Sequence, residues 1–172
     1  MKRIIVAFGV CVLFIMVCGN IVFAAENTGS IKGAITWQYN NFVGTKGDVG
    51  AKIELIPESF DINNITVDEE SAWVVGDRVP KESNIFIAHA DGYGNYEING
   101  VPSGTYMLLI VSNKTTRDFY VEPSKSPFEQ YMRDWKNFKL CMLSVNKYTY
   151  RYVTIREGIT SVESYDFGNT YI

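Results

Sequence analysis

The residues able to support catalysis are few in this chain. It has a single histidine, His89, and three cysteines, of which Cys11 and Cys18 fall within an apolar N-terminal run. A hydrolytic triad needs a histidine beside an activated nucleophile, and no Gly-x-Ser-x-Gly motif accompanies His89. The remaining thiol, Cys141, forms neither an internal disulfide nor, with His89, a complete metal site. We therefore expect no catalytic residue, no metal and no cofactor, and we interpret His89 and Cys141 as ordinary strand residues.

One group of neighbouring side chains has the composition of a carbohydrate site. Sugar sites stack planar rings and surround them with amides and carboxylates. The candidate ligand-binding residues, at the end of the first expected strand, are Trp37, Tyr39, Asn40 and Asn41, and the adjacent Phe42 adds a further planar ring to the set. Packing is the alternative role, because Trp37 and Tyr39 share a strand face with Ile31 and Ile35.

An acidic cluster, Asp68 to Glu70, invites comparison with a cation site. Ca²⁺ takes six to eight oxygen ligands, and no loop spacing around the cluster supplies them. Thr66 and Glu69 have the spacing of a capping box, and Gly76 stands where a helix would stop. We therefore interpret the cluster as the acidic first turn of a short helix.

Charge and hydropathy place the protein outside the cytoplasm and away from nucleic acid. The net charge is −3 and no basic stripe is present to neutralise phosphates. Lys2 and Arg3 precede an apolar run, residues 4–25, which is typical of a targeting segment. We predict a signal peptide over residues 1–24. The alternative is an uncleaved membrane anchor through residues 4–25, since about 20 apolar residues span a bilayer. Either way the protein is secreted or extracytoplasmic.

The stretch Ala88–Val111 organises the rest of the chain. Two turn sequences, Asp91–Asn95 and Gly100–Gly104, separate three apolar runs, which predicts consecutive antiparallel strands. Thr105–Val111 is almost wholly apolar and rich in β-formers, so we expect a strand buried on both faces.

This stretch resembles the signature of carboxypeptidase regulatory-like domains. The residues that carry the resemblance are Asp91-Gly92-x-Gly94-x-Tyr96-x-Ile98-x-Gly100-Val101-Pro102-x-Gly104-x-Tyr106-x-Leu108. The resemblance implies an all-β, prealbumin-like antiparallel β-sandwich of about seven strands over residues 29–172. The segment Val153–Val162 is similar to the last hairpin of that family.

Two helical insertions are expected within the sandwich, near residues 58–83 and 123–139. The first contains the capping box described above. The second begins at another capping box, Ser126 to Glu129, with proline at its first helical position. Its apolar residues recur at helical spacing, and they are Phe128, Tyr131, Met132, Trp135 and Phe138. This stripe packs on the sandwich or, alternatively, forms an exposed partner-binding face.

The other runs complete the expected strands. Residues 40–50 are polar and Gly-rich, which indicates a loop, and Phe119–Val121 is long enough to pair only briefly. Leu140–Val145 suits the interior of a sheet, and the alternation from Tyr148 to Ile155 predicts a further strand.

Collagen-adhesin B-type domains, which have a similar sandwich, imply an intramolecular isopeptide bond. That bond joins a lysine of the first strand to an Asn or Asp of the last, beside a buried glutamate. Lys32 with Asp166 or Asn169 matches the pair. The acid departs from the pattern, because the chain has Ile110–Ser112 at its position and Glu97 is an imperfect substitute.

These observations predict a non-catalytic exported surface or envelope module with a structural or binding role. Its expected partner is a protein or a cell-wall glycan. The alternatives are a carbohydrate- or peptidoglycan-binding module and a hydrolase whose site the sequence does not reveal.

Overall fold

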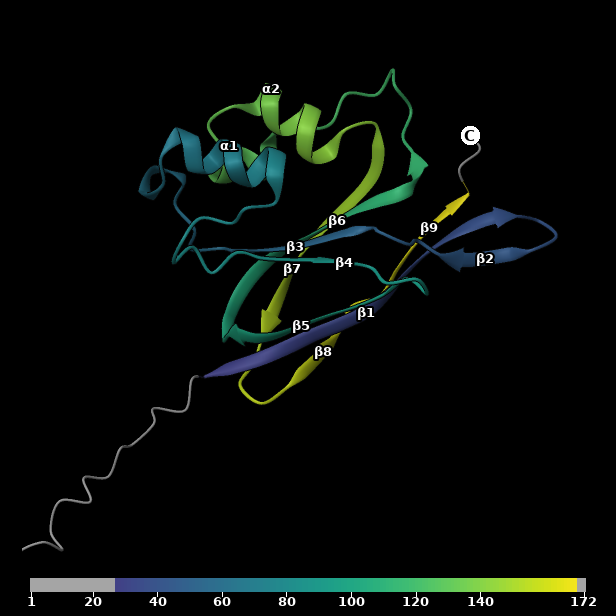
Figure 1. Cartoon of the computed structure of the whole chain (residues 1–172), viewed down its shortest axis with the longest axis horizontal. Helices are drawn as coiled ribbons and strands as arrows, with labels where there is room; N and C mark the ends of the chain where they lie inside the picture. The colour runs from purple at the N-terminus through teal and green to yellow at the C-terminus, as the bar shows by residue number, and fades with distance from the viewer. Residues whose placement is uncertain (1–26, 170–172) are drawn as a thin grey trace, which may run out of the picture.

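The computed structural model describes residues 27–169, which form two β-sheets and a helical layer (Figure 1). The predicted signal or anchor segment, residues 1–24, lies outside the described residues, as do residues 170–172. None of the helices between residues 27 and 169 is long and apolar enough to cross a membrane.

The first sheet is built around β1, Thr28–Asn40. One edge of β1 pairs antiparallel with β5 (Asn95–Pro102) and then β2 (Gly44–Gly47). The other edge pairs parallel with β8 (Thr160–Val162) and then β9 (Tyr165–Asn169). The prediction of an antiparallel sandwich is therefore wrong for β8 and β9. The chain crosses from the other sheet before β8 and enters this sheet in the direction of β1.

The second sheet is antiparallel in the order β4-β3-β6-β7. Its strands are β4 (Phe86–His89), β3 (Lys52–Pro57), β6 (Gly104–Thr116) and β7 (Asn146–Ile155). Residues 27–169 thus contain nine strands rather than about seven. The difference arises from β2, within the expected loop at 40–50, and from the division of the last strand into β8 and β9.

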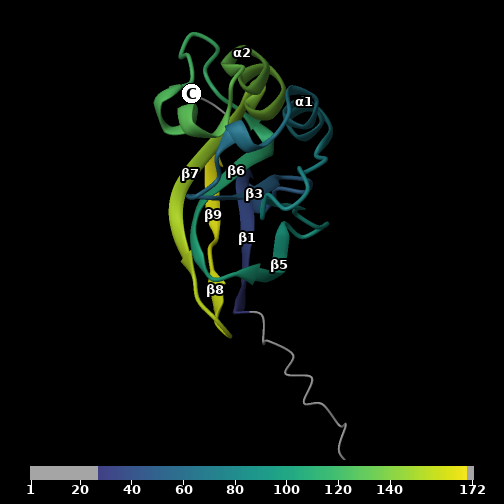
Figure 2. The same ribbon diagram turned by 90° about the vertical axis from the view of Figure 1, so that its left-hand side faces the viewer.

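The helical segments cover the face of the second sheet that points away from the first (Figures 1 and 2). They are the 3-10 turn Ile62–Asn64, α1 (Val67–Gly76), the 3-10 turn Ser126–Tyr131, α2 (Trp135–Phe138) and the π-helical turn Lys139–Leu143. Phe128, Tyr131 and Phe138 are fully buried against the sheet, so the predicted aromatic stripe is core and not an exposed partner-binding face.

Strand β6 is buried on both faces, which confirms the prediction for Thr105–Val111. Tyr106, Leu108 and Ile110 point into the core between the two sheets. The alternate residues Met107, Leu109 and Val111 point into a second core beneath the helices. Because side chains alternate along a strand, one strand supplies both cores.

Consecutive strands of the Ala88–Val111 stretch lie in different sheets. β4 belongs to the second sheet, β5 to the first and β6 to the second. Neither turn therefore joins two paired strands, which the prediction of consecutive antiparallel strands had implied. The turn after β4 passes close to β1: Gly94 has φ 87°, and a Cβ there would lie 2.4 Å from the Ile35 carbonyl oxygen. The Val153–Val162 segment also crosses between sheets, from β7 to β8.

Three local predictions in the second half of the chain are wrong. Leu140–Val145 is not a strand, because the π-helical turn there buries Met142 and Leu143 beneath α2, and Cys141 is exposed. The expected capping box at Ser126 makes no side-chain cap, whereas Asp134 caps α2 by accepting from the Asn137 amide. Residues 119–121 form an exposed loop without strand pairing.

The two-faced burial of β6 gives the first testable prediction. Leu108→Ala and Leu109→Ala, one directed into each core, should each lower the free energy of unfolding by about 2–5 kcal/mol. Urea unfolding of the two variants measures this. A loss below about 1 kcal/mol for Leu109→Ala alone would contradict a packed helical layer.

Candidate functional site

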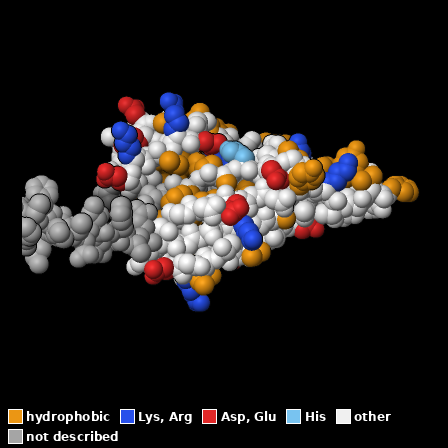
Figure 3. Space-filling model, turned by 60° about the horizontal axis from the view of Figure 1, so that its bottom comes forward, with side chains coloured by type: hydrophobic (Ala, Val, Ile, Leu, Met, Phe, Trp, Pro, Cys, Tyr) orange, Lys and Arg blue, Asp and Glu red, His pale blue; other side chains and the backbone are white. Residues whose placement is uncertain are grey.

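The end of β1 and strand β2 form a protruding hairpin, which we call the arm (residues 36–47; Figures 1 and 3). At its tip the Asn40 Oδ1 atom accepts hydrogen bonds from the backbone amides of Phe42 (2.9 Å) and Val43 (2.7 Å). Gly44, with φ 77°, completes the reversal. The turn leaves the side chain of Phe42 100% exposed and that of Val43 55% exposed. Figure 3 shows hydrophobic side chains gathered on this tapered end.

The structure brings the four predicted ligand-binding residues together on the arm, where each has a partner within the chain. Trp37 is half-buried against the core between the sheets and meets the Tyr39 ring edge-on, with centroids 5.5 Å apart. Tyr39 is 44% exposed, and the Lys46 ammonium lies 3.9 Å from its ring centroid. Asn40 closes the turn, and the Asn41 Oδ1 atom accepts from Gln38 Nε2 at 3.1 Å. These contacts support the shape of the arm.

The most exposed side chains of the arm are Phe42, which the sequence places beside the four candidate residues, and Val43, which lies outside the predicted set. A sequence signal for them exists, because a large apolar pair within a polar, Gly-rich stretch has no strand neighbour to cover it.

Beside the arm lies a groove of about 420 Å³, which we call the end groove. It opens where the inner face of the first sheet extends past the second, since Tyr165 and Phe167 of β9 form part of its wall. The residues that line it are Arg117, Asp118, Val121, Glu122, Pro123, Lys147, Tyr148, Tyr165 and Phe167.

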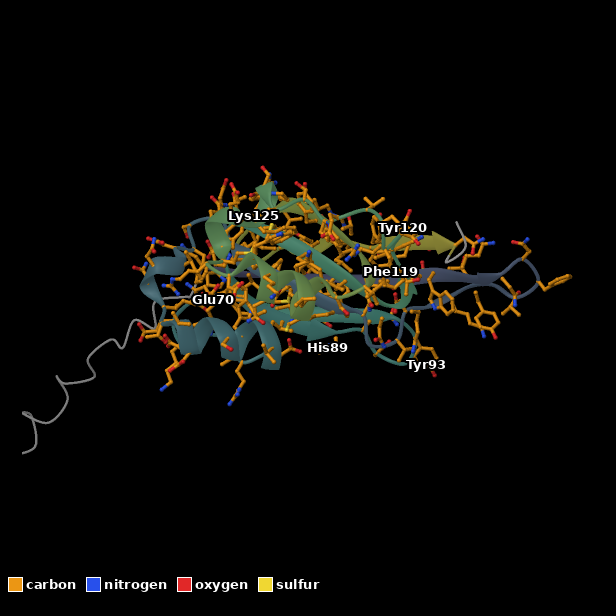
Figure 4. All side chains as sticks on the ribbon, turned by 90° about the horizontal axis from the view of Figure 1, so that it is seen from above. Glu70, His89, Tyr93, Phe119, Tyr120 and Lys125 are labelled. Carbon is orange, nitrogen blue, oxygen red and sulfur yellow. The ribbon has the colours of Figure 1, made fainter. Side chains whose placement is uncertain are left out.

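The loop at the rim of the end groove presents further aromatic side chains. Phe119 is exposed and Tyr120 is 97% exposed, and Figure 4 shows both on the same side of the molecule. Arg117 holds this loop by donating to the carbonyl oxygens of Val121 (2.8 Å) and Ser144 (3.3 Å). The loop is therefore ordered by its backbone contacts while its aromatic rings face solvent.

A cluster of charged side chains, partly buried, lies under α1. The ammonium of Lys52 forms an ion pair with Asp77 and lies 3.6 Å from Glu54 Oε1. Trp73 Nε1 donates to the same Glu54 oxygen at 2.7 Å, and the second oxygen, Oε2, is buried without a hydrogen-bond partner. Burial raises the pKa of Glu54, against the opposing charge of Lys52. For Asp77, partial burial opposes ionisation, but the hydrogen bond and charge of Lys52 outweigh it and lower the pKa.

His89 belongs to this cluster and has no nucleophile beside it. Its Nε2 atom lies 3.1 Å from Asp77 Oδ2, and within residues 27–169 no hydroxyl or thiol hydrogen-bonds to its ring. His89 also lines a shallow groove of about 600 Å³ with Ser164, whose hydroxyl accepts from the Ala34 amide. The geometry lacks the nucleophile–base contact that acyl transfer requires.

The acidic residues of α1 are occupied by contacts within the chain. Thr66 and Glu69 form the predicted capping box, and Glu70 pairs with Arg133 at 3.3 Å. Glu70 also accepts from the Arg133 backbone amide at 2.7 Å. Among the described residues, no group of three or more His, Cys, Asp or Glu is placed to hold a metal ion.

The residues considered for an isopeptide bond are not brought together. Lys32 pairs in register with Val162 of β8, whereas Asp166 pairs with Thr36. Four residues of strand separate the two positions, roughly 13 Å at 3.3 Å per residue. Because β8 and β9 run parallel to β1, Asp166 lies farther along β1 than Lys32, and the two side chains are not neighbours as the resemblance implied.

Comparison with known proteins gives structural likeness alone. No family model matches the sequence, and no curated protein matches it. A Pseudomonas aeruginosa protein provisionally described as carbohydrate-binding is 13% identical, with a TM-score of 0.40 over 81% of this chain and 90% of that one. A minor pilin of Streptococcus agalactiae is 14% identical, with a TM-score of 0.42 over 83% of this chain and 45% of that one. The major pilin SpaD of Corynebacterium diphtheriae is 9% identical, with a TM-score of 0.39 over 82% of this chain and 32% of that one. Likeness at this level transfers no ligand or partner to this chain.

The buried Glu54 predicts a pH-dependent effect of substitution. A raised folded pKa means that the stability contributed by the protonated carboxyl is complete below the unfolded value of 4.5 and is lost as pH rises through the folded pKa. Glu54→Gln, which keeps an oxygen for Trp73, should therefore gain stability relative to the natural protein as pH rises from 4 to 8. Thermal unfolding at each pH measures the difference, and a difference that is constant with pH would contradict it.

Two of the three aromatic residues of the arm, Trp37 and Phe42, predict effects of different size on stability. Trp37→Ala removes packing on the core and should cost about 2–3 kcal/mol, below the range for a fully buried tryptophan. Phe42→Ser, at a fully exposed position, should change stability by less than about 0.5 kcal/mol. Denaturant unfolding separates the cases, and equal losses would show that the tip is packed in solution.

Proposed function

We propose that this chain is a non-catalytic, exported surface module that binds its partner through the arm and the rim of the end groove. The single observation that carries the proposal is the exposure of large apolar side chains at this end. Four such side chains face solvent there, although residues close to them in the chain are packed into the core. They are Phe42, Val43, Phe119 and Tyr120. Exposed apolar clusters of this kind mark interaction sites.

The position of the arm supports a role away from the point of attachment. β1 begins at Thr28, directly after the predicted targeting segment, and the arm is at its far end (Figure 1). A strand of 13 residues spans roughly 43 Å at 3.3 Å per residue. A retained N-terminal anchor would therefore hold the arm well away from the bilayer.

The chemistry of the polar groups supports binding over catalysis. Two of the carboxylates with perturbed pKa values, Glu54 and Asp77, are joined to one another through Lys52 under α1. His89 is oriented by Asp77 but faces no hydroxyl or thiol partner among the described residues. We also propose that the β-sandwich is of the prealbumin-like kind that the sequence resemblance implies.

A glycan is the alternative partner. Tyr39 presents a ring, and Asn40 and Asn41 stand beside it, as a sugar site requires. Lys46 lies over that ring, and the amide oxygens already accept hydrogen bonds within the arm. A sugar stacked on Tyr39 would have to displace Lys46, whereas an apolar partner surface meets Phe42 directly.

Binding to envelope material tests the proposal. Phe42→Ser should reduce retention of the protein on isolated envelope fractions at least tenfold, because it removes the most exposed apolar side chain of the arm. Tyr93→Ser is the matched control, since Tyr93 is an exposed aromatic residue on the β4–β5 turn. Lys46→Ala should increase binding if a glycan stacks on Tyr39 and leave it unchanged if a protein surface binds Phe42. Equal retention of Phe42→Ser and the natural protein would contradict the proposal.

A further inference from the structure

We infer that the partner bound by the arm is a second copy of this chain, with Phe42 of each copy seated in the end groove of the other. The inference rests on the proposed function and names its partner. The chain carries both halves of the contact at one end: a protruding apolar tip and a neighbouring groove with apolar walls.

The arm and the end groove are adjacent on the same sheet. β9, which supplies Tyr165 and Phe167 to the groove, pairs directly with β1 at the base of the arm. The register places Tyr165 opposite Ile35 and Asn169 opposite Gln38. A two-fold axis beside β9 can therefore place each arm against the other groove in one closed, self-complementary contact.

The groove has the chemistry to accept an aromatic side chain. Its volume of about 420 Å³ falls within the range of pockets that enclose small organic groups. Val121, Pro123 and Phe167 supply apolar walls, and Tyr148 and Tyr165 supply rings for edge-to-face contact.

The charges at the rim suit a contact between identical faces. Arg117 and Lys147 are positive, whereas Asp118 and Glu122 are negative; Glu122 also pairs with Lys139 at 2.7 Å, and Lys147 donates to the Asn169 carbonyl oxygen at 2.6 Å. In a two-fold dimer the same face of each copy meets the other in the opposite orientation. A rim that carries both positive and negative side chains can then bring opposite charges together across the interface without a net repulsion. A rim of one sign would have opposed self-association.

The exposed apolar area is sufficient for a dimer. The relevant side chains are Tyr39, Phe42, Val43, Phe119, Tyr120 and Val121. Given their exposed fractions, they present on the order of 800 Å² per copy, about the area that one partner contributes to a standard stable interface. Neither a glycan nor an isolated peptide is needed to account for an apolar surface of this extent.

Site-directed cross-linking tests the inference in the full chain within expressing cells. One copy carries Phe42→Cys and a differently tagged copy carries Val121→Cys, both with Cys141→Ser. Mild oxidation should give the mixed dimer at least tenfold more than the matched pair in which Tyr93→Cys replaces Phe42→Cys. Tyr93 is similarly exposed but lies on the opposite side from Phe119 and Tyr120 (Figure 4). Cys141→Ser alone measures any cross-linking through Cys11 and Cys18.

Sedimentation of the purified protein under reducing conditions gives a second measurement that is independent of introduced cysteines. The natural protein should associate as a dimer, and Phe42→Ser should weaken the association at least tenfold, while the unfolding midpoints of the two proteins agree at concentrations low enough to keep both monomeric. A monomer throughout the concentration range, or a dimer unaffected by Phe42→Ser, would overturn the inference. If Phe42→Ser lowers envelope retention but no cross-link forms, the arm binds a different partner: the proposed function stands and the self-association fails.

Discussion

The burial of β6 on both faces is the constraint on which the rest of the structure depends. Leu108 and its alternate neighbours complete the core between the sheets, and Leu109 and its neighbours complete the core beneath the helices. A strand in this position must be covered on its outer face, and the two helical insertions supply that cover. The insertions are therefore a packing requirement of this sequence as well as an addition to the sandwich.

The charged residues beneath and between the helices hold that cover in place. Arg133 joins the second insertion to the first: its side chain pairs with Glu70 of α1 and donates to the carbonyl oxygens of Ile62 and Ile65. Trp73 and Asp77, one turn apart at the C-terminal end of α1, fix that end of the helix to β3 through Glu54 and Lys52. Buried charges of this kind stabilise little on balance but leave few alternative arrangements. These charged groups bind to one another within the fold. The exposed apolar side chains at the arm end of the molecule have no such partners and are the surface we propose for binding.

Sequence reasoning succeeded where the pattern was local. The apolar run of β6 predicted its two-faced burial, and the Thr66–Glu69 spacing predicted the cap of α1. It failed where a choice depended on distant residues. The turn at Asp91–Gly94 has the composition of a hairpin turn, but close approach of Gly94 to Ile35 directs the chain into the other sheet. Leu140–Leu143 has the composition of a strand, yet it forms a helical turn, because that conformation packs Met142 and Leu143 into the core beneath α2.

The candidate site was predicted in location and in part of its composition. Trp37, Tyr39, Asn40 and Asn41 are on the arm as a group, because the alternation of β1 and the polar turn after it are local features. Phe42 belongs to the predicted set of rings and amides, but its full exposure depends on the protrusion of the arm beyond the second sheet, and therefore on the relative lengths of strands far apart in the chain. The end groove likewise combines residues 117–123 with β7 and β9, and no short segment contains its pattern.

The central claim, that β6 unites the two cores in one cooperative unit, is tested most directly by native-state amide hydrogen exchange. The account predicts that amides from Met107 to Val111 exchange only through global unfolding, at the free energy that denaturant unfolding gives. Amides of β2 in the arm should exchange at a much lower free energy, since few buried contacts hold them. Exchange of the β6 amides through a separate, lower-energy opening of the helical layer would contradict the account.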